Sequence, residues 1–544
     1  MITSAPSTAA AWLPGPDPIH LEPGELSQAC TRFRESAHVL KHAETGRVAV
    51  GFGGHVEWVE GPTEWILLGA LPPLWPEWLG DRGFNETHRV RFPYIGGEMA
   101  NGIASVEMVI ALAEAGMLGF FGAAGLSPVR IEESVKILAE KLGTEAEPGS
   151  RPWGANLIHS LHEPALEERT VDIFLAHGVS RVSASAFMGL TPAIVRYAFK
   201  GVHLNAEGHL VRPHHVFAKI SRPETARAFI SPPPAAMLQT LVERGGLTPE
   251  EAALAARLPV AEDITAESDS GGHTDNRPLG SLFPTIRTLA DQLAREYGYK
   301  RPIRVGAAGG LGTPAAVAAA FAYGAAYVMT GSINQSAREA GQSEAARKML
   351  ALADMADVVM CPAGDMFELG VKVQVLKKGT MFASRAQRLY DLYSGYDSLE
   401  SLPADVRSKL EKDILQQSVE AVWDECMRYF TMRDPLQLAR AERDPKHRMA
   451  LVFRWYLGQS SRWAIAGIPE RRMDYQIWCG PAMGAFNAWA KGTFLEDPAQ
   501  RGVVQMGLNL LEGAAVATRA QQLRCYGAPI PPNAFDFRPR PLTI

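Results

Sequence analysis

The sequence predicts an α/β fold centred on a TIM barrel, a closed (β/α)8 arrangement of parallel strands and helices. Between about Arg91 and Met360, short apolar and β-prone runs alternate with helical patterns, and about eight such runs occur. The chain has 544 residues, which fits a barrel of roughly 250 residues with further units attached. A doubly wound open sheet is the alternative, but continuous alternation over roughly 270 residues favours closure into a barrel.

The predicted strands are short runs rich in apolar and β-branched residues, each followed by a loop and a helical pattern. Alternating strands and helices form a parallel sheet, so the carboxyl ends of the strands would meet at one face, where TIM barrels carry their active sites. The strands are expected at Phe92–Ile95, Leu118–Phe121, Gly154–Leu157, Arg181–Ser185, Val216–Ile220, Val260–Ile264, Ile303–Val305 and Tyr327–Met329.

Several of the intervening helices carry start signals. In three places a Ser or Thr precedes a proline, so a capping hydroxyl stands before a residue whose φ already suits the first helical turn. An apolar stripe at helical spacing also predicts one helix face that packs against the sheet. The start signals are Ser127-Pro128, Thr191-Pro192 and Thr313-Pro314, and the stripe is Ile103, Val106, Ile110 and Ala113.

The pattern changes on either side of the barrel. Residues 1–90 are rich in Pro, Gly and Trp and are expected to form an irregular N-terminal subdomain. The barrel is assigned to residues 91–370. Residues 371–544 contain longer helical patterns, such as Ala383–Tyr393 and Ala404–Phe430, and are expected to form a helical substrate-binding or lid domain.

Composition narrows the class of protein. Hydrophobic residues make up 47% of the chain and charged residues 21%, which is typical of a globular protein with a large core. A net charge of −5 argues against a general nucleic-acid binder. The five cysteines are scattered and include no CxxC pair, so we expect reduced thiols and no metal site. No signal peptide or membrane span is apparent, which favours a soluble, cytoplasmic protein.

Two glycine-containing loops follow the last two predicted strands. The seventh strand leads into Gly306–Gly312 and the eighth into Gly331-Ser332. Either loop alone could be a tight turn, but the loops after strands seven and eight of a TIM barrel together form its usual phosphate site. The spacing is not that of the GxGxxG dinucleotide fingerprint. We therefore expect a phosphate at these two loops and no dinucleotide.

A polar loop, Ala266–Arg277, follows the sixth predicted strand and so lies on the catalytic face. It contains three acids (Glu267, Asp269 and Asp275), the pair Gly271-Gly272, and His273. A histidine titrates near neutral pH and is suited to proton transfer. The alternative is a solvated loop whose histidine is structural. The glycine pair indicates close backbone approach and favours a ligand pocket.

Further candidates follow other strands. The segment Ile95–Gly102 could let a flat ring lie against the backbone, and Asn156 could hydrogen-bond a heterocycle. The alternatives are a tight turn and a buried asparagine satisfied by the backbone. Lys219 could lie near the anionic edge of such a ring, or it could be a surface lysine.

Taken together, these segments resemble the nitronate monooxygenase (2-nitropropane dioxygenase) superfamily. The more specific resemblance is to the PfaD family of trans-acting enoyl reductases of polyunsaturated fatty acid and polyketide synthases. It covers nearly the whole chain and rests on long motifs. These are Gly102–Met108 (GIASVEM), Asp269–Pro278 (DSGGHTDNRP), Asp365–Lys372 (DMFELGVK) and Val375–Phe382 (VLKKGTMF).

The resemblance implies a barrel that binds FMN and passes a hydride from NADPH to the β-carbon of a 2-enoyl thioester. His273 would donate the α-proton or polarise the thioester carbonyl, with a water as the alternative donor. Glu98 is an extra acid in the first loop. The implied flavin-ring contacts are Gly97, Met99, Ala100, Asn156, Lys219, Gly271 and Gly272, and the implied phosphate contacts are Gly309, Gly310, Gly331 and Ser332.

Two other functions stay open. Nitronate oxidation on the same barrel would use His273 as a base and would need no NADPH. The other is a non-catalytic synthase subunit that keeps the barrel as a scaffold. The long helical part favours a bulky substrate carried on an acyl carrier protein, and a homodimer is the common default. Such a carrier could dock on a basic run that could equally be a solvated helix start, namely Lys372, Lys377, Lys378, Arg385 and Arg388.

Overall fold

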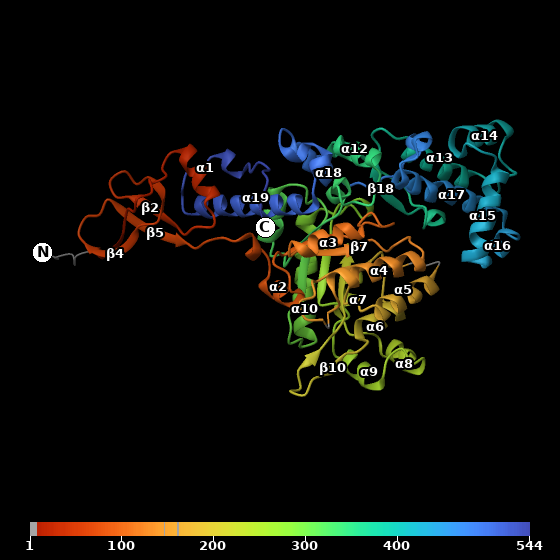
Figure 1. Ribbon diagram of the computed structural model, residues 1–544, viewed down its shortest axis with the longest axis horizontal. Coiled ribbons are helices and arrows are strands. Elements are labelled where there is room, and N and C mark those ends of the chain that lie inside the picture. The colour runs from red at the N-terminus through yellow and green to blue at the C-terminus, as the bar shows by residue number, and fades with distance from the viewer. Residues whose placement is uncertain (1–7, 146, 160–162, 544) are drawn as a thin grey trace.

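The computed structural model describes residues 8–145, 147–159 and 163–543. At its centre is a closed barrel of eight strands, each hydrogen-bonded in parallel to its neighbours in chain order, and the predicted TIM barrel is thus confirmed (Figure 1). The strands are β6 (Tyr94–Gly96), β7 (Leu118–Phe121), β8 (Gly154–Ile158), β9 (Arg181–Ser185), β12 (His215–Ile220), β13 (Asp263–Glu267), β15 (Arg304–Ala308) and β16 (Val328–Thr330).

Each predicted barrel strand is present, with small differences at its ends. The sixth was expected to begin at Val260 and begins at Asp263. Val260 and Ala261 are buried, but the backbone N–H of Ala261 bonds to Phe229 and not to a neighbouring strand. The strand instead runs on through Thr265, whose hydroxyl is satisfied inside the barrel by Tyr327 at 2.8 Å. Polar residues can therefore extend a barrel strand where a partner is close.

Helices surround the barrel, and the three predicted start signals are confirmed. Ser127, Thr191 and Thr313 each accept a backbone N–H three residues on, at 3.4, 3.3 and 3.3 Å. The helices are α3 (Val106–Glu114), α4 (Pro128–Leu142), α5 (Pro164–Ala176), α6 (Pro192–Phe199), α7 (Pro223–Ile230), α8 (Ala235–Glu243), α9 (Pro249–Ala255), α10 (Leu279–Glu296), α11 (Pro314–Ala322) and α12 (Glu344–Ala351).

The buried stripe of α3 differs from the predicted one. Val106 and Ile110 are only half-buried, whereas Met108, Val109 and Leu112 are buried. Two strand glycines determine which face of α3 is buried. A Cβ on Gly96 would lie 2.2 Å from Leu112, and one on Gly119 would lie 3.0 Å from the Cα of Val109. The helix settles where its large side chains fill the space that these glycines leave.

The N-terminal part is more regular than its Pro- and Gly-rich composition indicates. Its strands form one antiparallel sheet in the order β3-β2-β5-β1-β4, beside helix α1 (Figure 1). Buried Val39, Val50 and Phe52 of the sheet share a core with Leu26 and Cys30 of the helix. The bounds are β1 (Thr8–Leu13), α1 (Pro23–Thr31), β2 (Ala37–His42), β3 (Val48–Phe52), β4 (His55–Glu60) and β5 (Trp65–Leu71).

Helix α2 (Arg82–His88) closes the amino-terminal end of the barrel. Buried His88 bonds to Asp263 at 3.0 Å and accepts from Arg181 at 3.3 Å, and Arg304 also pairs with Asp263. Asp263, Arg181 and Arg304 are the first residues of their strands. Because this end is filled by an ion-pair network, the carboxyl-terminal end is left for a binding site.

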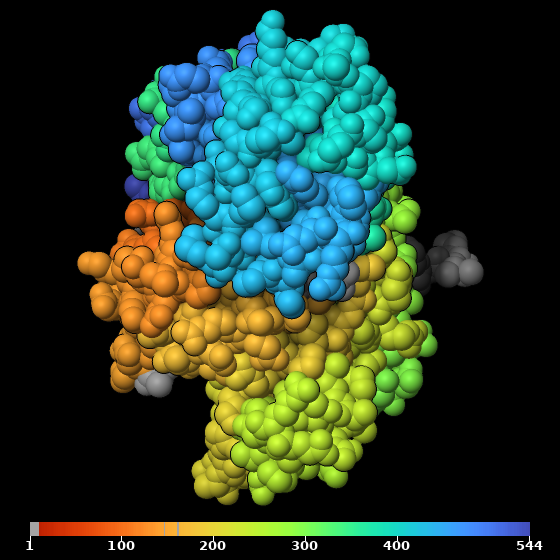
Figure 2. Space-filling model, turned by 90° about the vertical axis from the view of Figure 1, so that its right-hand side faces the viewer, coloured from red at the N-terminus to blue at the C-terminus, as the bar shows by residue number. Residues whose placement is uncertain are grey.

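After the barrel strands comes a hairpin, β17 (Val358–Pro362) and β18 (Lys372–Leu376), followed by helices. The single helix expected over Ala404–Phe430 is wrong: the chain breaks at Gln416, which has a φ of +58°, and Ser418 caps a new helix. Figure 2 shows the light-blue surface of this helical part lying against the orange and yellow surface of the barrel's outer helices, where Arg433 pairs with Glu163. The helices of the helical part are α13 (Phe382–Gly395), α14 (Ala404–Lys409), α15 (Val419–Arg433), α16 (Pro435–Ala441) and α17 (Pro445–Ala466).

The last two long helices return to the main core. Helix α18 (Ala482–Ala490) and helix α19 (Val503–Cys525) belong to the same buried cluster as the barrel. Helix α19 runs alongside the barrel towards the N-terminal sheet (Figure 1). Its Gly513 lies so close to α11 that a Cβ would be 2.6 Å from the ring of Pro314. The C-terminal part therefore contacts the helix that follows the Gly309-Gly310 loop.

Candidate active site

The predicted site residues lie at or just beyond the carboxyl ends of the barrel strands. Met99 and Ala100 follow β6, Lys219 lies near the end of β12, and His273 follows β13. Parallel strands of a closed barrel bring these ends to one face. Gly309 and Gly310 follow β15, and Gly331 and Ser332 follow β16, at the same face.

His273 is held by residues from beyond the barrel. The pair Gly272–His273 forms a short strand, β14, that pairs antiparallel with β18. The Nε2 of His273 lies 2.9 Å from the Oδ2 of Asp365, in the loop between β17 and β18. Burial alone would lower the pKa of His273, but the hydrogen bond and charge of Asp365 outweigh it and raise that pKa. Asp365 therefore stabilises the protonated imidazole, and Nδ1 is left for another partner.

The same hairpin fixes the rest of the polar loop. Gln374 of β18 is buried, and its Nε2 donates to Asp269 Oδ1 and to the Ser270 carbonyl, both at 2.7 Å. Asn276 donates to the same Asp269 oxygen at 2.9 Å. The predicted polar loop is thus ordered by side chains, and its glycine pair lies against another segment: a Cβ on Gly271 would be 2.8 Å from the backbone of Cys479.

Lys219 is not a surface lysine. Its Nζ lies 2.8 Å from the Oε1 of Glu267 at the end of β13 and 3.4 Å from the Oε1 of Glu98 after β6. Burial opposes its charge, but the two carboxylates outweigh burial and raise its pKa. The Glu98 side chain is only 4% exposed, and neither of its oxygens makes a hydrogen bond with a described residue. A buried carboxylate, Glu98, and a half-buried one, Glu267, thus share one ammonium group.

The two glycine loops have the shape of an anion cradle. Gly309 and Gly310 are both left-handed, with φ of +82° and +68°. A Cβ on Gly309 would lie 2.7 Å from Ser268, whereas beyond Gly310 and Gly331 no described atom lies within 4 Å of the Cβ position. Open space in front of two glycine backbones, beside the N-terminus of α11, suits a phosphate group.

Segment 478–482 joins the glycine loops to the His273 loop. The backbone N–H of Gly480 donates to Ser332 Oγ at 3.0 Å. A Cβ on Gly480 would lie 2.9 Å from the N atom of Gly271, and one on Gly312 would lie 2.1 Å from the carbonyl of Ala482. Both candidate loops therefore pack against one stretch of the C-terminal part.

The remaining candidates are buried near the same face. Gly97 donates its N–H to the Thr330 carbonyl at 2.7 Å, and Met99 is buried while Ala100 is half-buried. Asn156 donates its Nδ2 to the Ser183 carbonyl at 3.2 Å and to Ser185 Oγ at 2.7 Å. Its amide nitrogen is thus already paired within the barrel. Contacts of these residues with a flavin remain predictions.

Asp365 and Glu267 were missed as site residues by the sequence analysis. Asp365 lies 92 positions from His273 along the chain, and only its place at the start of the DMFELGVK motif marked it. Glu267 stands in the quoted polar loop, but its pairing with Lys219 follows from two neighbouring strands. The register that places Lys219 opposite Thr265 sets that pairing.

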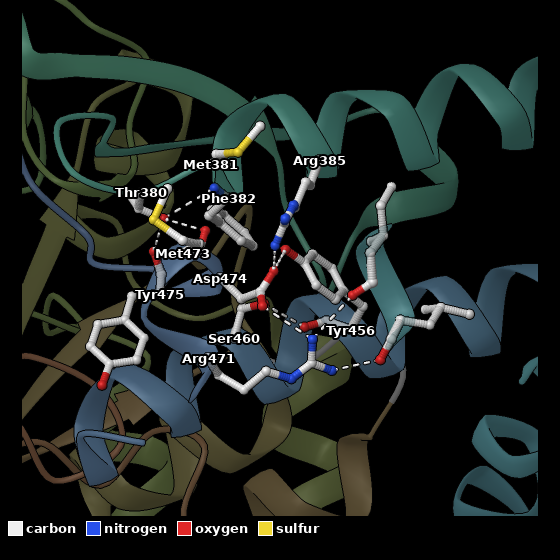
Figure 3. Close-up of polar contacts among 12 residues, drawn as sticks. Thr380, Met381, Phe382, Arg385, Tyr456, Ser460, Arg471, Met473, Asp474 and Tyr475 are labelled. Atoms are coloured by element: carbon white, nitrogen blue, oxygen red, sulfur yellow. Dashed lines mark hydrogen bonds and ion pairs between the residues drawn. The ribbon is translucent and has the colours of Figure 1, made fainter. Parts of the chain in front are cut away.

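The basic run proposed as a docking site is partly wrong. Arg385 does not lie on a free surface: its guanidinium pairs with Asp474, a fully buried acid that also accepts from Tyr456 at 2.7 Å and from Arg471 at 3.1 Å (Figure 3). Lys378 pairs with Asp357 at 3.1 Å. The sequence around Arg385 could not reveal its partner, because Asp474 follows the end of α17 and lies 89 positions away along the chain. Lys372, Lys377, Lys378 and Arg388 are exposed, so only Arg385 is withdrawn from the surface.

The cysteines are unpaired thiols within the described chain. Four of them are buried and Cys525 is exposed, and none of the five forms a disulfide. Within residues 8–145, 147–159 and 163–543, no group of three His, Cys, Asp or Glu side chains is arranged to hold a metal ion. Over the same ranges, every helix is too short or too polar to cross a lipid bilayer.

One family model matches a short segment of the chain, and several known proteins match more than 80% of it. A family model described as the inserted helical domain of [acyl-carrier-protein] S-malonyltransferase matches residues 396–475. A polyunsaturated fatty acid synthase subunit from Thraustochytrium sp. is 48% identical over 454 residues, which are 82% of this chain and 30% of that protein. Polyketide biosynthesis protein PksE of Bacillus subtilis is 43% identical over 450 residues, 83% of this chain and 58% of PksE.

One solved structure matches over nearly its whole length. The crystal structure of the enoyl reductase domain of MlnA, from the macrolactin biosynthesis cluster of Bacillus amyloliquefaciens, has 35% sequence identity and a TM-score of 0.78. The match covers 82% of this chain and 99% of that domain. By contrast, the chain spans between 23% and 58% of the length of the curated relatives it matches.

Proposed function

The chain belongs to the PfaD family of synthase enoyl reductases, within the nitronate monooxygenase superfamily, and from this we propose that it reduces the C=C bond of 2-enoyl thioesters. The proposed hydride donor is NADPH, the proposed cofactor is FMN, and the proposed substrate is an acyl chain on an acyl carrier protein. The reaction would serve polyunsaturated fatty acid or polyketide synthesis. The domain boundaries at residues 90 and 370 are part of this proposal.

One observation carries the proposal: the His273–Asp365 pair stands at the face of the barrel where the two glycine loops also open. A proton-transfer group beside an anion cradle is what a reductase with a phosphate-bearing cofactor needs. The enoyl reductase domain of MlnA, 35% identical over 99% of its length, supports the same reaction class.

The residues present fit FMN. The open space at Gly310 and Gly331 suits its phosphate, and the absence of a dinucleotide fingerprint argues against FAD. The Lys219 ammonium group, 3.4 Å from Glu98 and 2.8 Å from Glu267, is a cation that suits the polar edge of the ring system. When bound, FMN supplies the hydride chemistry, taking a hydride from NADPH and giving it to the β-carbon of the enoyl group.

The protein's own part is to orient the substrate and to supply a proton. Because Asp365 is bound to Nε2 of His273, the proton for the α-carbon would leave from Nδ1. The imidazole would then be neutral with its remaining hydrogen on Nε2, still donated to Asp365, and solvent would restore the lost proton. Asp365 is thus a positioning residue, and His273 is the proposed catalytic acid.

The decisive experiment is anaerobic. The purified protein is reduced with NADPH while its flavin absorbance is followed, and the reduced protein is then mixed with a crotonyl thioester. In a parallel sample the oxidised protein is mixed with a nitronate and no NADPH. We expect bleaching by NADPH, reoxidation by the thioester and no bleaching by the nitronate. Bleaching by the nitronate without reoxidation by the thioester would assign the protein to nitronate chemistry, because a nitronate gives electrons to the oxidised flavin. A protein purified without flavin that cannot bind FMN would overturn the flavin assignment.

A further inference from the structure

Glu98 is the most unusual side chain at the candidate site. Its side chain is 4% exposed, and its two oxygens make no hydrogen bond of normal geometry with the residues that the structure describes. The Ser183 hydroxyl and the Glu98 backbone N–H are close enough to lower its pKa, but burial outweighs them and raises it. An ionised carboxylate normally accepts several hydrogen bonds when buried, because burial without partners is unfavourable for a polar group and far more so for a charge.

The surroundings of Glu98 give it one counter-charge that it must share. Lys219 Nζ lies 3.4 Å from Glu98 but only 2.8 Å from Glu267, which also accepts from Ser270 at 3.2 Å. Glu267 therefore holds the lysine more closely. Fully ionised, these three groups carry one net negative charge in a buried setting.

The other titratable groups around this cluster do not remove that charge. Tyr327 is buried, and burial raises its pKa well above the ordinary value, so it stays neutral. His273 is influenced by both Lys219 and Glu267, but its own counter-ion is Asp365. Burial also raises the pKa of Glu98, with Lys219 opposing this only in part, so Glu98 is the member of the cluster that takes up a proton most readily.

Resting on the proposed flavin function, we propose that the Glu98–Lys219–Glu267 cluster takes up a proton on Glu98 when the flavin beside it is reduced. A flavin that gains two electrons and one proton carries one more negative charge than before. A second negative charge next to a cluster that is already negative favours protonation of the least stabilised carboxylate, which is Glu98. The proton comes from solvent and forms an O–H bond on the carboxylate, and it returns to solvent on reoxidation.

The test counts protons. The midpoint potential of the flavin in the holoenzyme is measured by dye equilibration between pH 6 and 8, and its slope against pH gives the protons bound per two electrons. We expect about two protons for the wild type and about one for Glu98→Gln, which keeps the size and removes the acid. Glu98→Ala, which also lacks the acid, should behave in the same way if the glutamine variant binds flavin poorly.

Glu262→Gln is the matched control. Glu262 is another buried acid, just before β13 and so at the opposite end of the strand that ends at Glu267, roughly 16 Å away at about 3.3 Å per residue. It should keep the wild-type slope. The same slope in the wild type and in both Glu98 variants, whether one proton or two, would overturn this inference while leaving the reductase proposal intact. Loss of flavin binding or of thioester reduction in the wild type would instead refute the proposed function.

Discussion

His273 is a half-buried side chain whose pKa is raised by Asp365, a residue 92 positions away in the sequence. It lies in a two-residue strand that pairs with β18, and in the proposed reaction it donates a proton. We expect His273→Ala to lower the rate of enoyl reduction by about 10²- to 10⁴-fold while flavin content stays normal. His177→Ala, which alters a histidine bonded to Glu132 on the barrel exterior, is the control and should leave the rate unchanged. A normal steady-state rate in His273→Ala would place the proton donor elsewhere.

Asp365 should set the pH range of the reaction. It raises the pKa of His273, and an acid catalyst loses activity as the pH rises through its pKa. In Asp365→Asn the pKa of His273 falls, so the loss of kcat/KM should begin at a lower pH, and the rate at neutral pH should fall at least about tenfold. The pH profile of kcat/KM measures this, with Asp391→Asn on α13 as the control. An unchanged falling limb would separate Asp365 from the catalytic histidine.

Gly331 allows a test of the phosphate site with a pair of substitutions that share one backbone. Its φ is −125°, outside the left-handed region, and no described atom lies within 4 Å of its Cβ position. Gly331→Asp would place a negative charge at the proposed phosphate and should weaken FMN binding about 100-fold, since like charges in contact cost several kcal/mol. Gly331→Asn has nearly the same shape without the charge and should bind FMN more tightly than Gly331→Asp. Equal dissociation constants for the two variants, by fluorescence titration, would argue against a phosphate there.

Among the elements, helices α13 and α17 are joined by buried charge. Asp474 receives Arg385 from α13, Tyr456 from α17 and Arg471 from the turn that follows, as Figure 3 shows. Arg471 also donates to the carbonyl of Leu415 and stacks over Trp463 with its Cζ 4.0 Å from the ring centre. This network ties the helical part together next to the segment that leads into Gly480.

Removing the charge of Asp474 should loosen that part of the molecule. Asp474→Asn leaves two largely buried guanidinium groups without their counter-ion, a change that typically costs about 3–5 kcal/mol. We expect a lower urea midpoint and faster amide hydrogen exchange in α13 and α17. Asp405→Asn, at an exposed acid on α14, should change stability by no more than about 0.5 kcal/mol. Wild-type exchange rates in α13 and α17 of Asp474→Asn would show that packing alone joins these helices.

At the scale of the whole molecule, α19 links the C-terminal part to the proposed phosphate site. The contact of Gly513 with Pro314 leaves no room for a side chain, and Pro314 begins the helix after the Gly309-Gly310 loop. Gly513→Val should destabilise the protein by about 1–3 kcal/mol through overpacking and should also weaken FMN binding by moving α11. Gly458→Ala, on α17 where no described atom crowds the Cβ position, is the control. Destabilisation with unchanged FMN affinity would show that α11 does not transmit the displacement.

The sequence alone was enough to determine the barrel and the ends of its strands where loops carry chemistry. Strand and helix periodicity are local, and capping pairs such as Thr313-Pro314 act within one turn, so they can be read without a fold. The placing of His273 and of the two glycine loops on one face followed from parallel topology alone. The regularity of the N-terminal sheet did not, because its pairings join segments separated by turns and rich in Gly and Pro.

Tertiary structure decided which side chains pair. The contacts of His273 with Asp365, Lys219 with Glu98 and Glu267, and Arg385 with Asp474 each join residues dozens of positions apart. No periodicity encodes such pairs, because they depend on strand register and on how the chain returns after the barrel. The role of a charged residue can also differ from the one that the sequence predicts. The sequence predicts that Arg385 is a free surface cation, but in the fold it pairs with the buried carboxylate of Asp474. Burial sets the energy of a charge, and burial belongs to the whole fold.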